Sequence, residues 1–399
     1  MVSVLHASFS ASGGAGWVAQ VLVREQNLLG LDSRLISNFD GGIKEDPLAH
    51  PLLTTYAAID ANLVSKNTRK AQVSLYRRKI ELFSRSEFTE SETIHLHWLE
   101  GALSHQSVRW LLDSGKRVTW TLHDMAPFTG GCHQSLSCEN YKSSCEACPQ
   151  VRVPFQMGIR NSLETRDLFS NPIDNLTVVA PTKWLADKAR VSRLFQNQRI
   201  EVIPNPISTK YFSRPSQLLT RSQIRSSRPG RLNLILIAND LNDPNKNVGS
   251  AVSAVDRVRK KSRSEITLTL VGQGGKKYAG HGFVSTLGPL EEEALIEQYD
   301  LADLLLSVSF GESFGLTIAE AAARGVPAIV FAGTGSEELV TEGESGWVAN
   351  NEDHLVSLLQ KAISSDLDIV AAGVFAQTKA NALFRPDLVA QNYMSTYNL

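Results

Sequence analysis

The sequence predicts an α/β protein with two doubly wound sheets. In both halves of the chain, short apolar runs typical of buried strands alternate with segments of helical periodicity. Between the halves, residues 208–230 are rich in Ser, Arg, Pro and Gln without apolar periodicity, which indicates a linker. The length of 399 residues also favours more than one domain. We therefore expect a domain over residues 1–207, a second over 208–380 and a last helix over 381–399.

The first half follows the order of a parallel, doubly wound sheet. A helix is expected over residues 17–29, after the first strand and a Gly-rich loop, and residues 44–90 are polar and helical in pattern. This alternation of strand and helix predicts parallel pairing. The apolar runs expected to form strands are residues 2–5, 34–36, 93–98, 117–122, 175–180 and 199–203.

The second half repeats the pattern and closes with a helical tail. A helix begins near Gly315 and ends at Gly325 and Pro327, and residues 352–399 read as helices. The apolar runs expected to form strands are residues 232–237, 267–271, 283–287, 302–308 and 328–331.

Composition limits the class of protein. Hydrophobic residues make up 42% of the chain and charged residues 20%, as in ordinary globular proteins. The formal net charge of −1 gives no reason to expect a nucleic-acid partner. We expect no secretory signal, because a basic n-region is absent and charged side chains interrupt residues 18–29. No apolar run reaches the roughly 18 residues of a membrane span, so we expect a cytoplasmic protein.

The most informative motif is residues 311–321, in which Glu312 and Glu320 are separated by seven residues at a strand-to-helix turn. Ligands of parallel α/β sheets bind at such turns, beyond the carboxyl ends of the strands. The helix start near Gly315 offers backbone N–H groups and a positive dipole end, which favour a phosphate. Farther along the helix, the Glu320 carboxylate can accept hydrogen bonds from a vicinal diol such as a ribose.

Two other loops are candidate phosphate sites. Gly13, Gly14 and Gly16 follow the first strand and let a phosphate approach the backbone, although such turns are often only tight connections. Lys246 follows the strand at 232–237 and offers a compact cation to a diphosphate. The alternative for Lys246 is a solvated loop lysine.

Histidines mark two strand ends in the first half. His123 follows the strand at 117–122, where its imidazole can hydrogen-bond a sugar hydroxyl or satisfy the strand end. His95 and His97 alternate on one strand and share a face, and both a ligand-facing position and structural burial remain open for them. Asp124 either orients an acceptor or caps the following loop.

All four cysteines, Cys132, Cys138, Cys145 and Cys148, fall within seventeen residues. Cys145 and Cys148 have zinc-knuckle spacing, and the other two can complete a structural four-thiolate zinc site. A long irregular loop of low apolar content also needs such a constraint to hold its shape. Two disulfides or redox-active thiols are the alternatives, and a cytosolic setting disfavours disulfides.

Together these motifs resemble retaining glycosyltransferases of family 4, the bacterial exopolysaccharide and lipopolysaccharide type with GT-B architecture. Residues 311–321 resemble their E-x7-E signature, and the cysteine loop resembles that of a subgroup linked to exopolysaccharide synthesis. The resemblance covers nearly the whole chain and implies two Rossmann-like domains facing a central cleft, with the last helix crossing back onto the first domain. It also includes residues 12–16, 121–124, 202–207, 270–274, 287–290, 333–338 and 346–347.

The resemblance implies transfer of a sugar from a UDP- or GDP-sugar to a glycan or lipid-linked acceptor, with no catalytic metal and with peripheral contact at the inner face of a membrane. The leaving phosphate then takes the acceptor proton in a front-face attack. His123, Lys246 and Glu312 are the implied catalytic residues, and Asn239 stands in the region where relatives usually carry an arginine. The residues implied to contact the donor are Gly13, Gly14, Gly16, Asn239, Lys246, Gly272, Leu290, Phe314, Gly315, Leu316, Thr317 and Glu320.

Two other functions compete with this interpretation. A sugar-nucleotide epimerase on the same fold needs further acid/base carboxylates and has no need of an acceptor-side loop like the one that carries the cysteines. A non-catalytic nucleotide- or glycan-binding protein can lose Glu312, Glu320 and Lys246, which this chain retains. Donor hydrolysis without acceptor, assayed across nucleotide sugars, separates the three.

Overall fold

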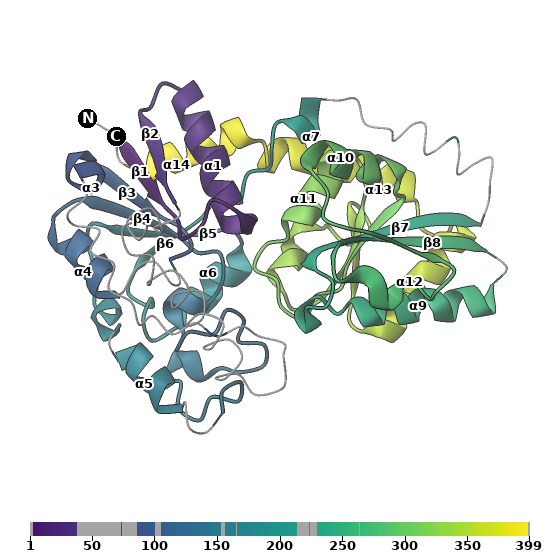
Figure 1. Ribbon diagram of the computed structural model, residues 1–399, viewed down its shortest axis with the longest axis horizontal. Coiled ribbons are helices and arrows are strands. Elements are labelled where there is room, and N and C mark those ends of the chain that lie inside the picture. Colours follow the sequence, from purple (N-terminus) through teal and green to yellow (C-terminus); the bar gives the residue numbers. More distant parts are fainter. Residues whose placement is uncertain are drawn as a thin grey trace, which may run out of the picture. The chain divides into compact units, whose positions relative to one another are not determined.

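The chain forms two compact units in a computed structural model (Figure 1). Unit 1 contains residues Met1–Pro206 and Pro386–Leu399, and unit 2 contains residues Ile207–Arg385. The residues that the structure describes are 3–37, 73, 86–99, 105–152, 156–164, 166–213, 223, 230–262 and 264–397.

Unit 1 is built on a parallel sheet with the strand order β2-β1-β3-β4-β5-β6. Its strands are β1 (Val4–Ala7), β2 (Ser33–Ile36), β3 (Thr93–Leu96), β4 (Arg117–Thr121), β5 (Leu176–Ala180) and β6 (Arg199–Val202). Its helices are α1 (Gly13–Leu28), α3 (Ser86–Glu90), α4 (His105–Asp113), α5 (Gln156–Glu164), α6 (Lys183–Arg190) and α14 (Pro386–Thr396). The order reverses between β1 and β3, and ligands of such sheets bind beyond the carboxyl ends of the strands at this switch point.

The last helix belongs to unit 1. Figure 1 shows α14 beside α1, although the two helices are far apart in the sequence. Tyr393 and Tyr397 are fully buried there. The Tyr397 hydroxyl accepts a hydrogen bond from Gln26 Nε2 at 2.8 Å, and the Tyr393 hydroxyl lies 3.0 Å from Thr121 Oγ1. Residues from the end of the chain therefore complete the core around the first sheet.

Unit 2 has a second parallel sheet with the order β12-β11-β10-β7-β8-β9. Its strands are β7 (Arg231–Asp240), β8 (Glu265–Gln273), β9 (Val284–Leu287), β10 (Leu304–Ser307), β11 (Ala328–Phe331) and β12 (Gly346–Ala349). Its helices are α7 (Lys210–Ser213), α9 (Val248–Lys261), α10 (Glu292–Leu301), α11 (Leu316–Ala323), α12 (Glu352–Ser364) and α13 (Ile369–Leu383). The switch point of this sheet lies between β7 and β10.

A buried arginine fixes the helix that carries Glu320. Arg324, which directly follows α11, has no exposed surface. Its Nε and Nη2 atoms each lie 3.0 Å from a carboxylate oxygen of Asp300, and its Nη1 donates to the Tyr211 carbonyl at 3.1 Å. Because a planar guanidinium pairs with a carboxylate in one geometry, these bonds set the position of α11 against α10.

The predicted fold class, two doubly wound parallel sheets, is confirmed. The sequence pattern does not predict β12. The polar stretch at 44–90 lies outside the described residues except for residue 73 and residues 86–90, and the linker is described only at 208–213, 223 and 230. Within the described part of the chain, no helix has the length and apolar character needed to cross a bilayer.

Candidate active site

The switch point of unit 2 brings a lysine and a glutamate together. Lys246 lies in the loop after β7 and Glu312 in the loop after β10, and Lys246 Nζ lies 2.8 Å from Glu312 Oε2. Both side chains keep part of their surface exposed. The Glu312 carboxylate raises the pKa of Lys246, so the lysine is a cation at neutral pH.

Backbone contacts hold these two loops together independently of the ion pair. The Asn245 carbonyl accepts a hydrogen bond from Phe310 N at 2.8 Å, and Asn245 Nδ2 donates to the Gly311 carbonyl at 2.8 Å. Asp243 caps the short turn before Lys246 by accepting from Asn245 N. The position of Lys246 therefore does not depend on its bond to Glu312.

A third loop, residues 333–337, packs directly on Glu312. Gly335 N donates to the Glu312 carbonyl at 2.7 Å. A Cβ atom at Gly335 would lie 2.3 Å from the Ser313 carbonyl oxygen, so only glycine allows this approach. The sequence motif at 333–338 therefore supports the backbone around Glu312.

The start of α11 is open in the way a phosphate site requires. Gly315 is the N-cap with φ of +106°, and no side chain caps the helix. Leu316 and Thr317 follow as its first two residues. Phe314 is buried, with its ring 5.6 Å from that of Phe384, so its side chain serves the core.

Glu320 lies in a buried, tyrosine-lined environment. Only 9% of the residue is exposed, and Tyr299 Oη donates to Glu320 Oε2 at 2.7 Å. Burial raises the pKa of Glu320 to about 7, against the opposing effect of the hydrogen bonds from Tyr299 and Tyr211. The sequence predicts the carboxylate but not the two tyrosines that hold it.

The other predicted donor residues of unit 2 lie at the carboxyl ends of its strands or beyond them. Asn239 is exposed at the end of β7, and Leu290 precedes α10. Gly272 has φ of +136°, and a Cβ there would lie 1.8 Å from the Ala238 carbonyl oxygen. A close approach of two strands accounts for Gly272.

The glycines of the Gly-rich loop in unit 1 have two different roles. Gly13 and Gly14 are exposed at the start of α1, and nothing lies within 4 Å of a Cβ built on Gly13. Gly16 is buried, and a Cβ there would lie 2.2 Å from the Ser10 carbonyl oxygen. Gly13 and Gly14 are therefore open to a ligand, whereas Gly16 is required by packing.

His123 follows β4 and bonds inward to a buried histidine. Its Nε2 lies 3.1 Å from His97 Nδ1, and burial lowers the pKa of His123 to about 4. The next residue, Asp124, accepts a hydrogen bond from Ala126 N and pairs with His133 Nδ1 at 2.6 Å. Asp124, which directly follows His123, thus caps the loop and also binds the cysteine segment through His133.

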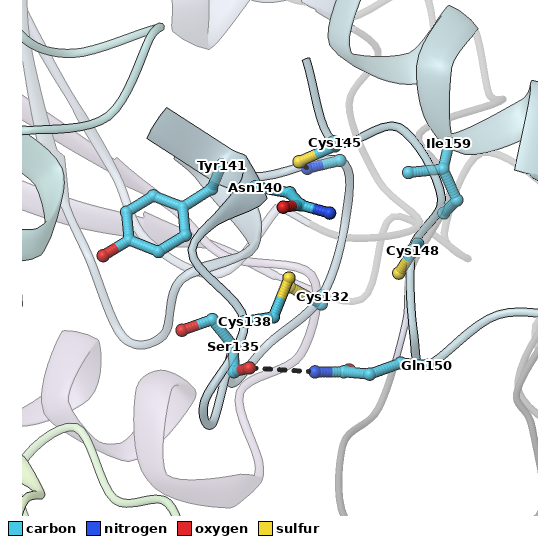
Figure 2. A pocket seen from close by; sticks show the side chains of 10 residues that line it. Cys132, Ser135, Cys138, Asn140, Tyr141, Cys145, Cys148, Gln150 and Ile159 are labelled. Atoms are coloured by element: carbon cyan, nitrogen blue, oxygen red, sulfur yellow. Dashed lines mark hydrogen bonds between the residues drawn. The ribbon is translucent and has the colours of Figure 1, made fainter. Parts of the chain in front are cut away.

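The four cysteines surround one cavity (Figure 2). All four are described, and the structure forms no disulfide among them. Gly130 N donates to Cys145 Sγ at 3.2 Å, and burial raises the pKa of the Cys145 thiol to about 11. No three of the sulfur atoms lie within 4.8 Å of one another in the described structure, so metal binding requires the loop to close around the ion.

Comparison with protein families decides the class. Residues 232–365, which include the loops that carry Lys246 and Glu312, match the family model described as "Glycosyl transferases group 1". Residues 232–365 thus form a group 1 glycosyltransferase domain, and the chain is a glycosyltransferase.

This glycosyltransferase is similar over its whole length to a curated bacterial protein. It is 24% identical to WcaC of Escherichia coli K12, a glycosyl transferase named for colanic acid biosynthesis, with 97% of each chain covered. It is 28% identical to alpha-monoglucosyldiacylglycerol synthase of Acholeplasma laidlawii over 46% of this chain and 48% of that protein.

Solved structures show the fold of the glycosyltransferase. Sucrose-phosphate synthase from Thermosynechococcus elongatus superposes with a TM-score of 0.67 and 15% identity over 100% of this chain and 98% of that chain. WaaG, from lipopolysaccharide biosynthesis, superposes with a TM-score of 0.61 and 15% identity over 98% of this chain and 99% of that chain. HepE of Anabaena in complex with UDP and glucose superposes with a TM-score of 0.58 and 15% identity over 100% of both chains. The predicted GT-B fold is confirmed.

Proposed function

We propose that this glycosyltransferase is a retaining enzyme that moves a sugar from a UDP- or GDP-sugar to a glycan or lipid-linked acceptor in polysaccharide biosynthesis. The observation that carries the proposal is the Lys246–Glu312 pair beside the open start of α11, at the switch point of unit 2. The similarity to WcaC supports the polysaccharide assignment, and the UDP complex of HepE supports a nucleotide-diphosphate donor. We place the reaction in the cytoplasm, at the inner face of the membrane.

Lys246 and the start of α11 provide the charge for the donor diphosphate. The ammonium and the free backbone N–H groups of the first helical turn are both positive, so they stabilise the negative charge that grows on the leaving group. Glu312 pairs with Lys246 until the donor arrives and then accepts hydrogen bonds from sugar hydroxyls. Glu320 accepts from the ribose.

The residues of unit 1 act on the acceptor. His123 bonds a substrate hydroxyl, and the exposed backbone at Gly13 and Gly14 receives a phosphate or an acceptor group. The leaving phosphate takes the acceptor proton in a front-face attack, because no carboxylate of the site is assigned as a covalent nucleophile. The cysteine loop, joined to His123 through Asp124 and His133, borders the acceptor.

The proposal is tested by incubating the purified chain with a panel of UDP- and GDP-sugars, with and without glycan and lipid-linked acceptors. We expect one nucleotide sugar to release its nucleotide slowly alone and faster with an acceptor, and the product to keep the anomeric configuration of the donor. Conversion of the nucleotide sugar to an epimer would show the competing enzyme class. Nucleotide binding without turnover of any sugar would show a binding protein.

We also propose that Cys132, Cys138, Cys145 and Cys148 hold a structural zinc ion. The donor set fits, because four thiols line one cavity and a backbone N–H already points at Cys145. Burial raises the pKa of the Cys145 thiol, and the Gly130 N–H and the buried Arg166 guanidinium oppose that rise, as they would stabilise a metal-bound thiolate. Bound zinc would displace the thiol protons and fix the loop, without an open position for catalysis.

Elemental analysis of protein made without a chelator or metal-affinity tag tests this assignment. We expect about one zinc per chain, and its loss in Cys145→Ser with the neighbouring Ser143→Ala as the matched control. Zinc-free protein with four titratable thiols would exclude any cross-link in the loop. Zinc-free protein without titratable thiols would mean disulfides.

A further inference from the structure

Four histidines of unit 1 meet at the switch point of its sheet. His6 lies on β1 in register with His95 on β3, His97 follows β3, and His123 follows β4. His6, His95 and His97 are buried, whereas His123 is half-buried. The buried histidines are not needed by the proposed chemistry of the diphosphate, so their arrangement requires its own explanation.

Three of these histidines form a hydrogen-bonded row that starts at Gln26. His6 Nε2 lies 2.9 Å from Gln26 Oε1, and His6 Nδ1 lies 3.0 Å from His97 Nε2. His97 Nδ1 lies 3.1 Å from His123 Nε2. We call Gln26, His6, His97 and His123 the histidine relay.

Each ring in the histidine relay is neutral. Burial lowers the pKa of His6 to about 4 and that of His97 well below its usual range, and the pKa of His123 is about 4. A neutral imidazole has one N–H donor and one acceptor nitrogen. In a row of such rings, the direction of the first hydrogen bond therefore sets the direction of all the others.

Gln26 sets that first direction. The Gln26 Oε1 atom accepts hydrogen bonds from the Ser33 hydroxyl and from His6 Nε2. The Gln26 Nε2 atom donates to the Tyr397 hydroxyl. His6 then carries its proton on Nε2 and accepts at Nδ1 from His97, which in turn accepts at Nδ1 from His123. Among the described residues, His123 Nδ1 has no hydrogen-bond partner, so its lone pair is left for a ligand.

A metal site is the other arrangement to consider, because ligand atoms of His6, His95 and His97 lie within 4.8 Å of one another. The ring planes argue against it. His97 stacks on His95 at 4.2 Å between ring centroids, so the in-plane lone pairs of these two rings run side by side rather than converging. All six ring nitrogens also have partners already, since His95 bonds Tyr397 and Thr121.

We propose that Gln26, His6 and His97 are positioning residues that fix His123 as the Nε2–H tautomer, so that Nδ1 accepts a hydrogen bond from a sugar hydroxyl of the bound substrate. This inference rests on the proposed function for the identity of the substrate, but the tautomer itself is a property of the free protein. A ring held in the Nε2–H tautomer always presents the Nδ1 lone pair to the hydroxyl, whereas a ring in two tautomers presents it only part of the time.

Long-range ¹H–¹⁵N correlation of histidine-labelled free protein tests the tautomer directly, with the spectrum of His123→Gln identifying the His123 signals. We expect the proton on Nε2 in His6, His97 and His123. A proton on Nδ1 of His123, or exchange between two tautomers, would overturn the proposal. Signals that change with a chelator would show a metal in place of the row of hydrogen bonds.

Variants test the coupling along the row. Gln26→Met, three links from His123, should leave His123 without a single tautomer and lower kcat at least about tenfold, with the affinity for the nucleotide unchanged. His95→Phe is the matched control, because His95 is equally buried but lies outside the histidine relay, and it should leave the His123 spectrum intact. An unchanged His123 spectrum in Gln26→Met would show that Gln26 does not set the tautomer of His123. If His123 has the expected tautomer but no nucleotide sugar of the panel is turned over, the proposed function is refuted instead.

Discussion

At the residue scale, the two glutamates of the 311–321 motif have opposite environments. Glu312 is partly exposed and pairs with Lys246, whereas Glu320 is buried and bonded to Tyr299. An ion pair that keeps part of its surface exposed can exchange its lysine for substrate groups at a smaller cost than a fully buried pair. A buried carboxyl held by tyrosines stays in place and changes its protonation instead.

The protonation of Glu320 makes stability depend on pH. Its pKa is about 7 in the folded chain and 4.5 when unperturbed, so the folded state keeps a proton that the unfolded state releases. The free energy of unfolding therefore falls as the pH rises from about 4.5 to about 7, by up to about 3 kcal/mol, and stays lower above that range. Glu320→Gln should be more stable than the parent near pH 8 and no more stable near pH 4, measured by urea unfolding.

The control for this experiment is Glu297→Gln on the exposed face of α10, which should change stability by less than about 0.5 kcal/mol at either pH. Glu320→Gln should also bind the nucleotide more weakly in calorimetry, because a charged acceptor is lost. A stabilisation that is equal at both pH values would contradict the raised pKa.

Lys246→Met should separate turnover from stability. The pair it breaks is partly exposed, so we expect a change in the free energy of unfolding of about 0–1 kcal/mol. Charge on the leaving diphosphate grows in the transition state, so kcat should fall about 100-fold, with a smaller change in donor affinity. Steady-state kinetics measures both, and Lys361→Met on the exposed face of α12 is the control. A rise in KM alone would mean that Lys246 only binds the donor.

At the scale of elements, the loops after β7, β10 and β11 support one another through backbone contacts. The Asn245 carbonyl of the first loop accepts from Phe310 N of the second, and Gly335 N of the third loop donates to the Glu312 carbonyl. Because main-chain bonds do not depend on side-chain rotamers, this arrangement fixes where Lys246 and Glu312 stand before any ligand binds.

Gly335→Ala should displace this arrangement. Its Cβ would lie 2.3 Å from the Ser313 carbonyl oxygen, so the loop must move away from Glu312. We expect a loss of about 1–3 kcal/mol in stability and a fall in kcat, measured by urea unfolding and steady-state kinetics. Gly249→Ala in α9, where nothing lies within 4 Å of the added atom, should be neutral or slightly stabilising. Equal behaviour of the two variants would show that the close approach has no role.

At the scale of the whole molecule, apolar runs predict both sheets, but pairings between distant segments cannot be read from local pattern. The sequence pattern does not predict β12, because its four residues lack a long apolar run. The motif predicts Glu320 but not Tyr299 or Tyr211, which approach it from elsewhere in the chain. Whether Gly16 is required for packing or for a ligand likewise depends on the distance between Gly16 and the Ser10 carbonyl. Only the folded backbone sets that distance.

Tyr397→Phe should weaken unit 1 alone. The variant loses a buried hydroxyl that bonds Gln26 and His95, a cost of about 1–3 kcal/mol. Hydrogen exchange should become faster in β1 and β3 and stay unchanged in β10 and β11. The control is Tyr278→Phe in unit 2, with no expected change in β1 or β3. Equal acceleration in both sheets would show that unfolding is not confined to unit 1.

The place of α14 also sets an order of events on the ribosome. Residues 386–397 are synthesised after all of unit 2, yet they supply Tyr393 and Tyr397 to the core of unit 1. At roughly 5–20 residues per second, the first sheet waits on the order of ten seconds or more for the helix that covers it, whereas the second sheet has its complete sequence earlier. Each nascent chain therefore has the complete sequence of unit 2 while unit 1 still lacks α14, and a message cut short before α14 yields a product whose first sheet lacks this helix.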